Sequence, residues 1–138
     1  RSEVAGAPSL WTSTIDAGEW ALDLRLQATQ PLLLQGEEGF SRKGPEEKQA
    51  SYYYSKPQLQ TTGHITLKGE RLPVKGTAWL DHEWSQELLH PDAVGWDWIG
   101  MNFFDGTALT AFQLRRKDGD QDAVRDLLRL RADYEADY

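Results

Sequence analysis

The feature that most constrains the fold of this chain is the alternation of apolar and polar residues with a period of two. In the stretch EWALDLRLQAT, residues 19–29, one side of an extended chain would be apolar and the other polar. The apolar positions are Trp20, Leu22, Leu24 and Leu26, and the polar positions are Asp23, Arg25 and Gln27. Successive side chains of a strand point to opposite faces, so this pattern predicts a strand with one buried face.

Two glycine-containing turns link further strands of this kind. The segments HITL and RLPV flank KGE at residues 68–70, and aromatic or aliphatic runs flank DG at residues 105–106. Short loops that contain glycine are typical of β-hairpins. Strands at this spacing predict a mainly β fold, arranged as an antiparallel barrel or sandwich.

One long segment between these strands lacks the alternation. Residues 30–51 combine glycine, proline and charges of both signs, which predicts a surface loop. A loop of this length in a compact domain often forms a lid or a binding loop. It is expected to be solvated, although Arg42 and Lys43 could contact an acidic group.

The C-terminal segment has a different pattern. Residues 121–136 carry apolar side chains at helical spacing, and no glycine or proline follows Gly119. This spacing predicts an amphipathic helix, which Asp120 or Asp122 could cap. The chain is therefore expected to contain a β domain over residues 1–119 and a short helical tail over the remaining residues.

Charge and composition exclude several kinds of partner. The formal net charge of −7 argues against a nucleic-acid surface, which is usually basic, and against adsorption to an anionic membrane. No apolar run approaches the ~20 residues that cross a bilayer, so no transmembrane segment is expected. The chain has no cysteine, so it forms no disulfide and no thiolate metal site.

The stretch AWLDHEWS, residues 78–85, places two acids, an imidazole and an indole in a row. If the stretch is a strand, Asp81 and Glu83 point to one face, while His82 and Trp84 point to the other. Only one of these faces can line an interior cavity. The stretch therefore predicts two half-sites that lie back to back.

The same rule applies to the aromatic stretch GWDWIGMNFF, residues 95–104. Trp96, Trp98 and Asn102 would share one face, and Asp97 would lie on the other. If this strand pairs with AWLDHEWS, the imidazole, indoles and carboxamide could converge. Alternatively, Asp97 could meet one of the two acids, and the sequence leaves both registers open.

Such a pocket would hold the groups needed for acid-catalysed addition of water to an alkene. A histidine or a buried carboxylic acid can donate a proton, because burial favours the neutral acid, and indole faces attract a developing carbocation. The same groups could simply hold an extended apolar ligand. Structural roles are also open: His82 as a hydrogen-bonded histidine, Asp97 as a loop anchor and the tryptophans as packing residues.

No motif in the sequence indicates a metal or an organic cofactor. His82 and Glu83 do not begin a HExxH zinc motif, because position 86 is Gln, and the three histidines are dispersed. A GxSxG nucleophile elbow, a P-loop and a GxGxxG motif are also lacking. The expected protein therefore uses neither a metal nor a cofactor.

Three stretches in this order resemble the carotenoid 1,2-hydratase (hydroxyneurosporene synthase) family, which includes AttH-like proteins labelled as secreted hydrolases. They are GFSRKGPEEKQASYYYSKPQL, GTAWLDHEWS and GWDWIGMNFFDGTALTAFQLR. The resemblance implies a lipocalin-like β fold, two consecutive domains in full-length bacterial members, and a periplasmic or secreted location. The chain begins at Arg1 and is shorter than such members, so it is expected to be part of a longer protein.

The resemblance also implies a function. Family members add water across a terminal double bond of an acyclic carotenoid, which implies a hydratase-type lyase for an apolar, terpenoid-like or lipid-like molecule. Together with the strand faces, it gives an expected catalytic set of His82, Asp81 and Asp97, and an expected ligand-binding set of Trp84, Trp96, Trp98, Tyr53, Glu83 and Asn102. A hydrolase and a non-catalytic lipocalin-type binding protein are the alternatives.

The placement of the acids and the imidazole distinguishes these classes. If His82 and Asp97 line a closed apolar pocket and have perturbed pKa values, catalysis gains support. If they face solvent or support loops, a binding or purely structural role gains support.

Overall fold

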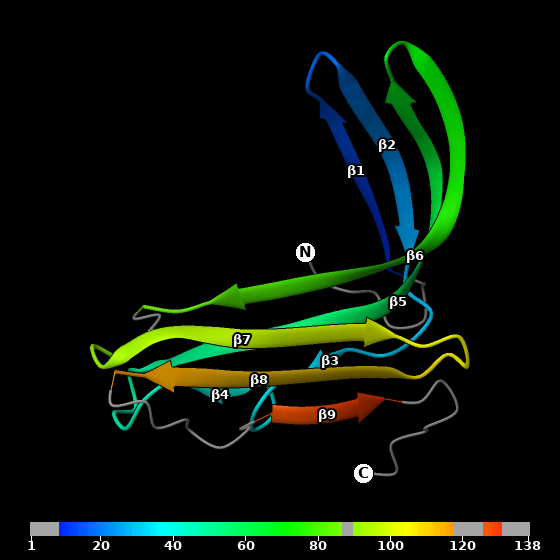
Figure 1. Cartoon of the computed structure of the whole chain (residues 1–138). Coiled ribbons are helices and arrows are strands. Elements are labelled where there is room, and N and C mark those ends of the chain that lie inside the picture. The colour runs from blue at the N-terminus through cyan, green and yellow to red at the C-terminus, as the bar shows by residue number, and fades with distance from the viewer. Residues whose placement is uncertain (1–8, 87–89, 118–125, 131–138) are drawn as a thin grey trace.

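The computed structural model describes residues 9–86, 90–117 and 126–130 of the chain. Every regular element in these residues is a β-strand (Figure 1), as the alternation predicts. The strands are β1 (Leu10–Asp16), β2 (Trp20–Gln27), β3 (Leu33–Leu34), β4 (Phe40–Arg42), β5 (Ala50–Leu67), β6 (Glu70–Trp84), β7 (Ala93–Asn102), β8 (Ala108–Arg116) and β9 (Asp126–Leu130). No helix in the described residues has the length and apolar character needed to cross a membrane.

The strands form two antiparallel sheets. In the first sheet, β6 pairs with one edge of the central strand β5, while β2, β3 and β4 share the other edge and β1 lies outside β2. The second sheet has the order β7-β8-β9. One half of the β5–β6 hairpin lies along β7 and β8, and the other half rises with β1 and β2 (Figure 1). The described residues form no closed barrel, so the fold is an open, lipocalin-like arrangement of antiparallel sheets.

The β5–β6 hairpin closes at the glycine turn that the sequence predicts. Leu67 pairs with Glu70, and the two residues between them, Lys68 and Gly69, have φ angles of 50° and 82°. Positive φ at both central positions is the geometry of a two-residue turn that matches the twist of the flanking strands. Glycine adopts this conformation without steric cost, so KGE fixes where the chain reverses.

A bulge interrupts the same hairpin further along. The pairing register between β5 and β6 shifts between Lys56 and Leu59. Pro57 has no N–H to donate to the ladder, and Gln58 has a φ of 52°, so the segment cannot continue a regular strand. Bulges bend strands and increase their twist, which accounts for the change of direction of the hairpin in Figure 1.

Asn102 and Gln58 fasten the two sheets together. Oδ1 of Asn102 accepts a hydrogen bond from the backbone N–H of Gln58 at 2.9 Å, and its Nδ2 donates to the carbonyl of Ala78 at 3.3 Å. Nε2 of Gln58 donates to the carbonyls of Phe103 and Thr107, both at 2.8 Å. These two side-chain amides thus form hydrogen bonds with backbone groups beside the bulge of β5 and in the loop after β7.

The core lies between the two sheets. Leu59, which follows the bulge, is 0% exposed, and one face of β8 is buried along its length. The buried residues of β8 are Ala108, Thr110, Phe112 and Leu114. This is the period-two alternation of a strand with one face in the core. The buried face of β8 therefore contributes one side of this core.

The prediction of a surface loop over residues 30–51 is wrong in part. The segment contains β3 and β4, which pair with β5, and it buries Gln35 and Lys43. The sequence did not indicate this burial because the buried side chains are polar. Hydrogen bonds compensate for it: Nε2 of Gln35 donates to Oγ of Ser55 at 2.9 Å. Burial of a polar group is tolerated when it is hydrogen-bonded.

The prediction of a helix over residues 121–136 is wrong for residues 126–130, which form β9. The other residues of that helix lie outside the described residues. In DLLRL, Leu128 and Leu130 also fit a period of two, and a short apolar run does not distinguish a helix from a strand. Pairing with the edge of β8 decides in favour of a strand, because it supplies backbone hydrogen-bond partners.

Candidate functional site

The strand β6 divides AWLDHEWS between two faces, as the alternation predicts. Asp81 and Glu83 point into the space between the two sheets, where they line a pocket. His82 and Trp84 point to the outer face of the first sheet, where they stack on aromatic residues of β5. Only the acidic face of this stretch therefore belongs to the pocket.

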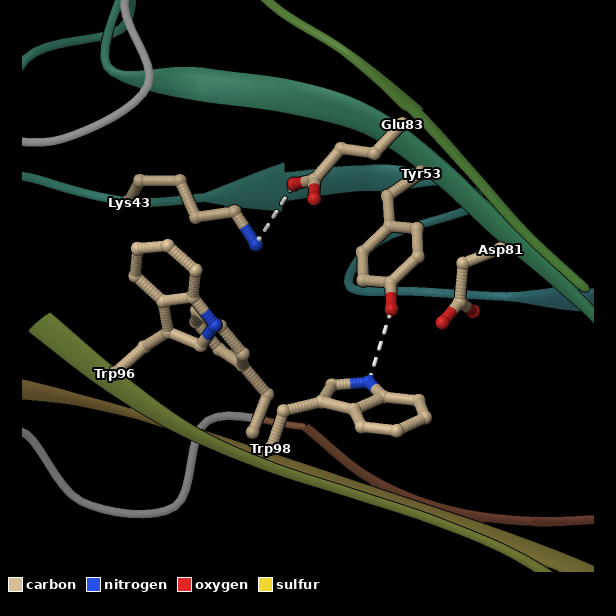
Figure 2. A pocket seen from close by; sticks show the side chains of 7 residues that line it. Lys43, Tyr53, Asp81, Glu83, Trp96 and Trp98 are labelled. Atoms are coloured by element: carbon tan, nitrogen blue, oxygen red, sulfur yellow. Dashed lines mark hydrogen bonds and ion pairs between the residues drawn. The ribbon is translucent and has the colours of Figure 1, made fainter. Parts of the chain in front are cut away.

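The pocket has a volume of about 340 Å³ and is bounded by the two sheets (Figure 2). It is lined by Lys43, Tyr53, Asp81, Glu83, Trp96, Trp98 and Phe112. Aromatic rings from β5, β7 and β8 form its walls, while the polar groups come from the first sheet and from the segment after β4. Ligand sites typically combine such apolar walls with a few convergent polar groups, and this volume lies at the lower end of their range.

Asp81 is held by hydrogen bonds from two elements. Its Oδ1 accepts from Oγ of Ser55 at 2.6 Å and from Nε1 of Trp79 at 2.8 Å. Hydrogen bonds to a carboxylate are stronger than those between neutral groups. The carboxyl group is therefore fixed in position at the pocket wall.

Tyr53 places its hydroxyl between Asp81 and Trp98. The phenol oxygen accepts a hydrogen bond from Nε1 of Trp98 at 3.0 Å, which joins the two sheets across the pocket (Figure 2). Burial, and then the negative charge of Asp81, raise the pKa of Tyr53 well above its usual value. The phenol therefore remains protonated at physiological pH and is available as a hydrogen-bond donor.

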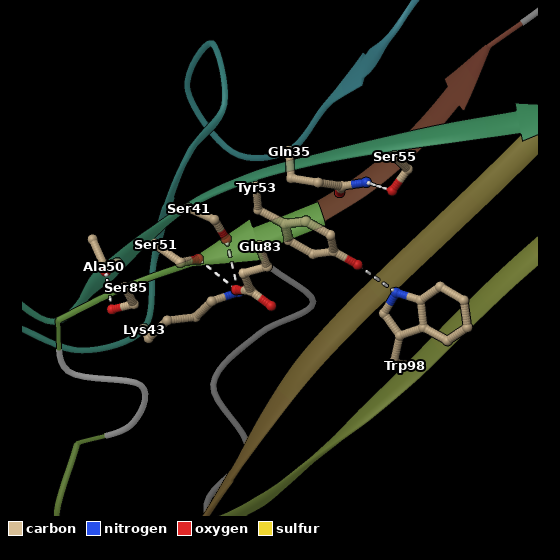
Figure 3. A network of polar contacts seen from close by, with 10 residues as sticks. All are labelled: Gln35, Ser41, Lys43, Ala50, Ser51, Tyr53, Ser55, Glu83, Ser85 and Trp98. Atoms are coloured by element: carbon tan, nitrogen blue, oxygen red, sulfur yellow. Dashed lines mark hydrogen bonds and ion pairs between the residues drawn. The ribbon is translucent and has the colours of Figure 1, made fainter. Parts of the chain in front are cut away.

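Lys43 brings a buried ammonium group to the other end of the pocket (Figure 3). Its side chain is 4% exposed, and Nζ lies 3.2 Å from Oε1 of Glu83 and 3.0 Å from Oγ of Ser41. The same Oε1 accepts a hydrogen bond from Oγ of Ser51. Nζ also lies 4.0 Å from the centre of the Phe112 ring. A buried cation needs such compensation, and here a carboxylate, a hydroxyl and a ring face supply it.

His82 and Trp84 form cross-strand pairs outside the pocket. The imidazole of His82 stacks on Tyr54 with ring centres 5.2 Å apart, and the indole of Trp84 stacks on Tyr52 at 5.5 Å. Each pair is directly opposite in the β5–β6 register. Aromatic pairs of this kind stabilise a sheet, so Trp84 has the packing role that was open for the tryptophans. His82 also packs by stacking, whereas the structural alternative from the sequence was a hydrogen-bonded histidine.

The strand β7 also follows the predicted alternation. Trp96 and Trp98 face the pocket. Asp97 lies on the opposite side with 61% of its side chain exposed, and its Oδ1 is 3.6 Å from Nε of Arg115. Asn102 holds the bulge of β5, as described above.

The structure thus divides the expected site residues into two groups. Those that line the pocket are Tyr53, Asp81, Glu83, Trp96 and Trp98, and those that do not are His82, Trp84, Asp97 and Asn102. Two lining residues were outside the expected set. Phe112 could have been found from the alternation of TALTAFQL, whereas Lys43 was concealed in a segment with the composition of a solvated loop.

No group of three histidine, aspartate or glutamate residues in the described parts of the chain could hold a metal ion. The polar atoms of the pocket are occupied with one another instead: Asp81 with Ser55 and Trp79, and Glu83 with Lys43. This pocket can therefore enclose an apolar group and donate hydrogen bonds to it. Its fixed carboxyl group can also transfer a proton.

The fold and the pocket define a class of protein: an open, lipocalin-like antiparallel β protein with an aromatic pocket that carries two acids. The sequence matches the AttH-like family over residues 2–135, and the chain belongs to that family. A search of curated proteins found no match.

The solved structures that are similar to this chain include two crystal structures. The first, of a protein designated AttH from Nitrosomonas europaea, is 50% identical, has a TM-score of 0.77, and is matched over 90% of this chain and 41% of its own length. The second, kievitone hydratase from Nectria haematococca, is 17% identical, has a TM-score of 0.63, and is matched over 93% of this chain and 45% of its own length. The chain therefore spans less than half the length of each of these proteins.

Gly100 provides a test of how Trp98 is positioned. A Cβ added at Gly100 would lie 2.4 Å from the end of the Trp98 ring, and the Trp98 ring also meets Trp79 edge to face at 5.9 Å. We expect Gly100→Ala to displace the indole, break its hydrogen bond to Tyr53 and lower the free energy of unfolding by about 1–3 kcal/mol. Urea unfolding and near-ultraviolet circular dichroism measure these two effects.

A double-mutant cycle supplies the control for this prediction. In a Trp98→Phe background the smaller ring leaves room for the methyl group, so Gly100→Ala should cost much less stability than in the wild type. An equal cost in both backgrounds would show that Gly100 acts on the backbone and not on the indole.

Proposed function

We propose that this pocket binds an extended, mainly apolar molecule and adds water to one of its double bonds. The observation that carries this proposal is the position of the Asp81 carboxyl and the Tyr53 phenol beside the ring of Trp98 in an aromatic cavity. Such a cavity favours apolar groups, and the acid belongs to its wall.

The proposed reaction needs one acid and one water molecule. A proton taken up from water converts the Asp81 carboxylate into the acid, which gives this proton to one alkene carbon and leaves a carbocation on the other. Water adds to that cation, and the proton it loses returns to the Asp81 carboxylate, so the atoms and charges balance. Hydrogen bonds from Ser55 and Trp79 stabilise the carboxylate in between, and the ring faces of Trp96 and Trp98 stabilise the cation.

Two comparisons support a hydratase. The kievitone hydratase shares the fold at 17% identity, and the three sequence stretches resemble carotenoid 1,2-hydratases. That resemblance and the apolar walls support a terpenoid-like or lipid-like substrate. Because the chain spans less than half of each similar structure, the substrate and activity are proposed for the whole protein.

A non-catalytic binding protein is the second candidate. It is favoured by the positions of His82 and Asp97, which lie outside the pocket, on the outer faces of β6 and β7. By the criterion set from the sequence, this placement supports a binding or purely structural role. The hydrolase alternative has no comparable observation in its favour, since no nucleophile elbow is present in the sequence.

The test is to incubate the protein with an acyclic terpenoid alkene in ¹⁸O-labelled water while tryptophan fluorescence is followed. Saturable quenching together with an ¹⁸O-labelled alcohol would support the hydratase. Saturable quenching with no product would support the binding protein. The absence of saturable quenching would overturn both.

We also propose, from the resemblance alone, that the full protein acts in the periplasm or outside the cell. Fractionation of its native host tests this location. Detection of the protein only in the cytoplasmic fraction would contradict it.

A further inference from the structure

The two acids of the aromatic pocket differ in how their charges are compensated. Nζ of Lys43 lies 3.2 Å from Oε1 of Glu83, so a cation balances that carboxylate. Asp81 is held by neutral donors instead, since its Oδ1 accepts hydrogen bonds from Ser55 and Trp79. Within residues 9–86, 90–117 and 126–130, no cationic side chain forms an ion pair with Asp81. The Asp81 end of the pocket therefore presents a carboxylate without a cationic partner among the described residues.

Aromatic rings that a ligand can reach face this carboxylate. Trp96 and Trp98 lie two residues apart on the pocket side of β7, across from Asp81 and Tyr53 (Figure 2). The Trp96 residue is 54% exposed, so its ring is open to a ligand that enters between the sheets. The face of an indole attracts a cation more strongly than the face of any other side chain. The carboxylate and the two indoles thus favour a positive charge in the same space.

The pocket already holds one cation in this manner. Nζ of Lys43 lies 4.0 Å from the centre of the Phe112 ring and 5.3 Å from the centre of the Tyr53 ring. Both distances are within the ~6 Å over which a ring face attracts an ammonium group. Lys43 reaches the Glu83 end of the pocket, and in the described part of the chain no ammonium or guanidinium group lies over Trp96 or Trp98.

We propose that the aromatic pocket binds an organic cation, a quaternary or protonated amine with an apolar chain. Its positive nitrogen lies beside the Asp81 carboxylate and against the rings of Trp96 and Trp98, as in the aromatic cages that bind quaternary ammonium groups. This inference rests on the proposed function, because it assumes that the pocket binds an apolar chain. The nitrogen takes the place of the carbocation of the proposed reaction, so the amine excludes the alkene.

The test compares two probes of nearly the same shape, octyltrimethylammonium and the neutral octyldimethylphosphine oxide. Binding of each is measured by calorimetry at low salt and below the concentrations at which micelles form. The variant is Asp81→Asn, which keeps the shape of the side chain and removes its charge. The matched control is Asp97→Asn, which removes the same charge from the outer side of β7. Circular dichroism checks that both variants fold.

The expected result is that the ammonium probe binds the wild type and the Asp97→Asn control roughly tenfold more tightly than the phosphine oxide. In Asp81→Asn this advantage should fall to roughly threefold, the part that the ring faces supply. The affinity for the phosphine oxide should change little. The control separates the pocket from the net charge of −7, which attracts any cation to the protein.

A second variant tests the rings without touching the acid. Trp96→Leu replaces an exposed indole by an apolar side chain, so the fold should be retained. Its loss should lower the affinity for octyltrimethylammonium by roughly threefold more than the affinity for the phosphine oxide, because only the cation gains from the indole face. Equal losses for the two probes would show that Trp96 contributes contact area alone and would contradict the cage.

Failure of this inference is distinguishable from failure of the proposed function. If the two probes bind the wild type equally, the pocket holds an apolar chain but does not select a cation. If Asp81→Asn and Asp97→Asn lose the preference equally, overall charge and not the pocket attracts the ammonium probe. If neither probe binds, the proposed function fails together with this inference.

Discussion

Asp81→Asn is expected to lower the rate of water addition by about 10²- to 10⁴-fold, the range found when a positioned acid is removed. The amide has nearly the same shape, and its oxygen can still accept the hydrogen bonds from Ser55 and Trp79. It has no proton to give to an alkene. Product formation should therefore fall while the affinity for the ligand changes little, and a single-turnover assay beside a binding titration separates the two.

The matched control is Asp97→Asn. This change also replaces an acid that the sequence places among tryptophans, but Asp97 is exposed on the outer side of β7 beside Arg115. Its loss should leave the rate within about twofold, since an exposed ion pair contributes little. Equal losses in the two variants, or a fully active Asp81→Asn protein, would contradict the assignment of Asp81 as the proton donor.

Gly63→Ala is expected to destabilise the first sheet strongly. Gly63 has a φ of 151°, and an added Cβ would lie 2.1 Å from the carbonyl oxygen of Asp23 and 2.9 Å from Cα of Leu24. These are backbone atoms of β2, so the clash can be relieved only by moving β2 away from β5. Backbone strain and overpacking together should lower the free energy of unfolding by about 2–5 kcal/mol, measured in urea.

Gly76→Ala is the control for this substitution. Gly76 lies on β6 opposite Thr61, and no atom lies within 4 Å of a Cβ added there. The change should be neutral, or stabilise by up to about 1 kcal/mol, because alanine restricts the unfolded chain. A Gly63→Ala protein as stable as the Gly76→Ala protein would show that β2 does not pack against β5 as closely as described.

Much of the fold could be predicted because the strands have local signals. The alternation in EWALDLRLQAT and the turn at KGE correspond to β2 and to the β5–β6 hairpin. The short strands β3 and β4 could not be predicted in this way, since they are held by long-range pairing to β5 and bury polar side chains. The strand β9 was mistaken for a helix for the same reason, because the edge of β8 determines its conformation.

The sequence predicts which residues of the candidate site share a strand face, but not which face lines the pocket. Period two placed Asp81 with Glu83 and Trp96 with Trp98, and these four residues do share the pocket. Which face of β6 lines the cavity depends on how the two sheets pack, and no local pattern contains that information. The structure selects the acids and places His82 on the outer face of the sheet.

The sequence left open a contact of Lys43 with an acidic group, but not its burial in the pocket wall. A lysine in the polar run SRKGPEEK is usually solvated, yet this one is buried against Phe112 and paired with Glu83. The groups around Lys43 come from separate segments of the chain, including β4, β6 and β8. Only the folded structure brings these groups together.

The central claim is that the ligand lies between the sheets, on the Asp81 face of β6. The most direct measurement is a titration of ¹⁵N-labelled protein with an acyclic terpenoid alkene, in which the indole N–H resonances are followed and assigned by single Trp→Phe substitutions. The resonances of Trp96 and Trp98 should shift saturably, because both rings line the pocket. That of Trp84, on the outer face with Tyr52, should stay unchanged. A shift of Trp84 with Trp96 and Trp98 unmoved would contradict the claim and place the ligand on the His82 face instead.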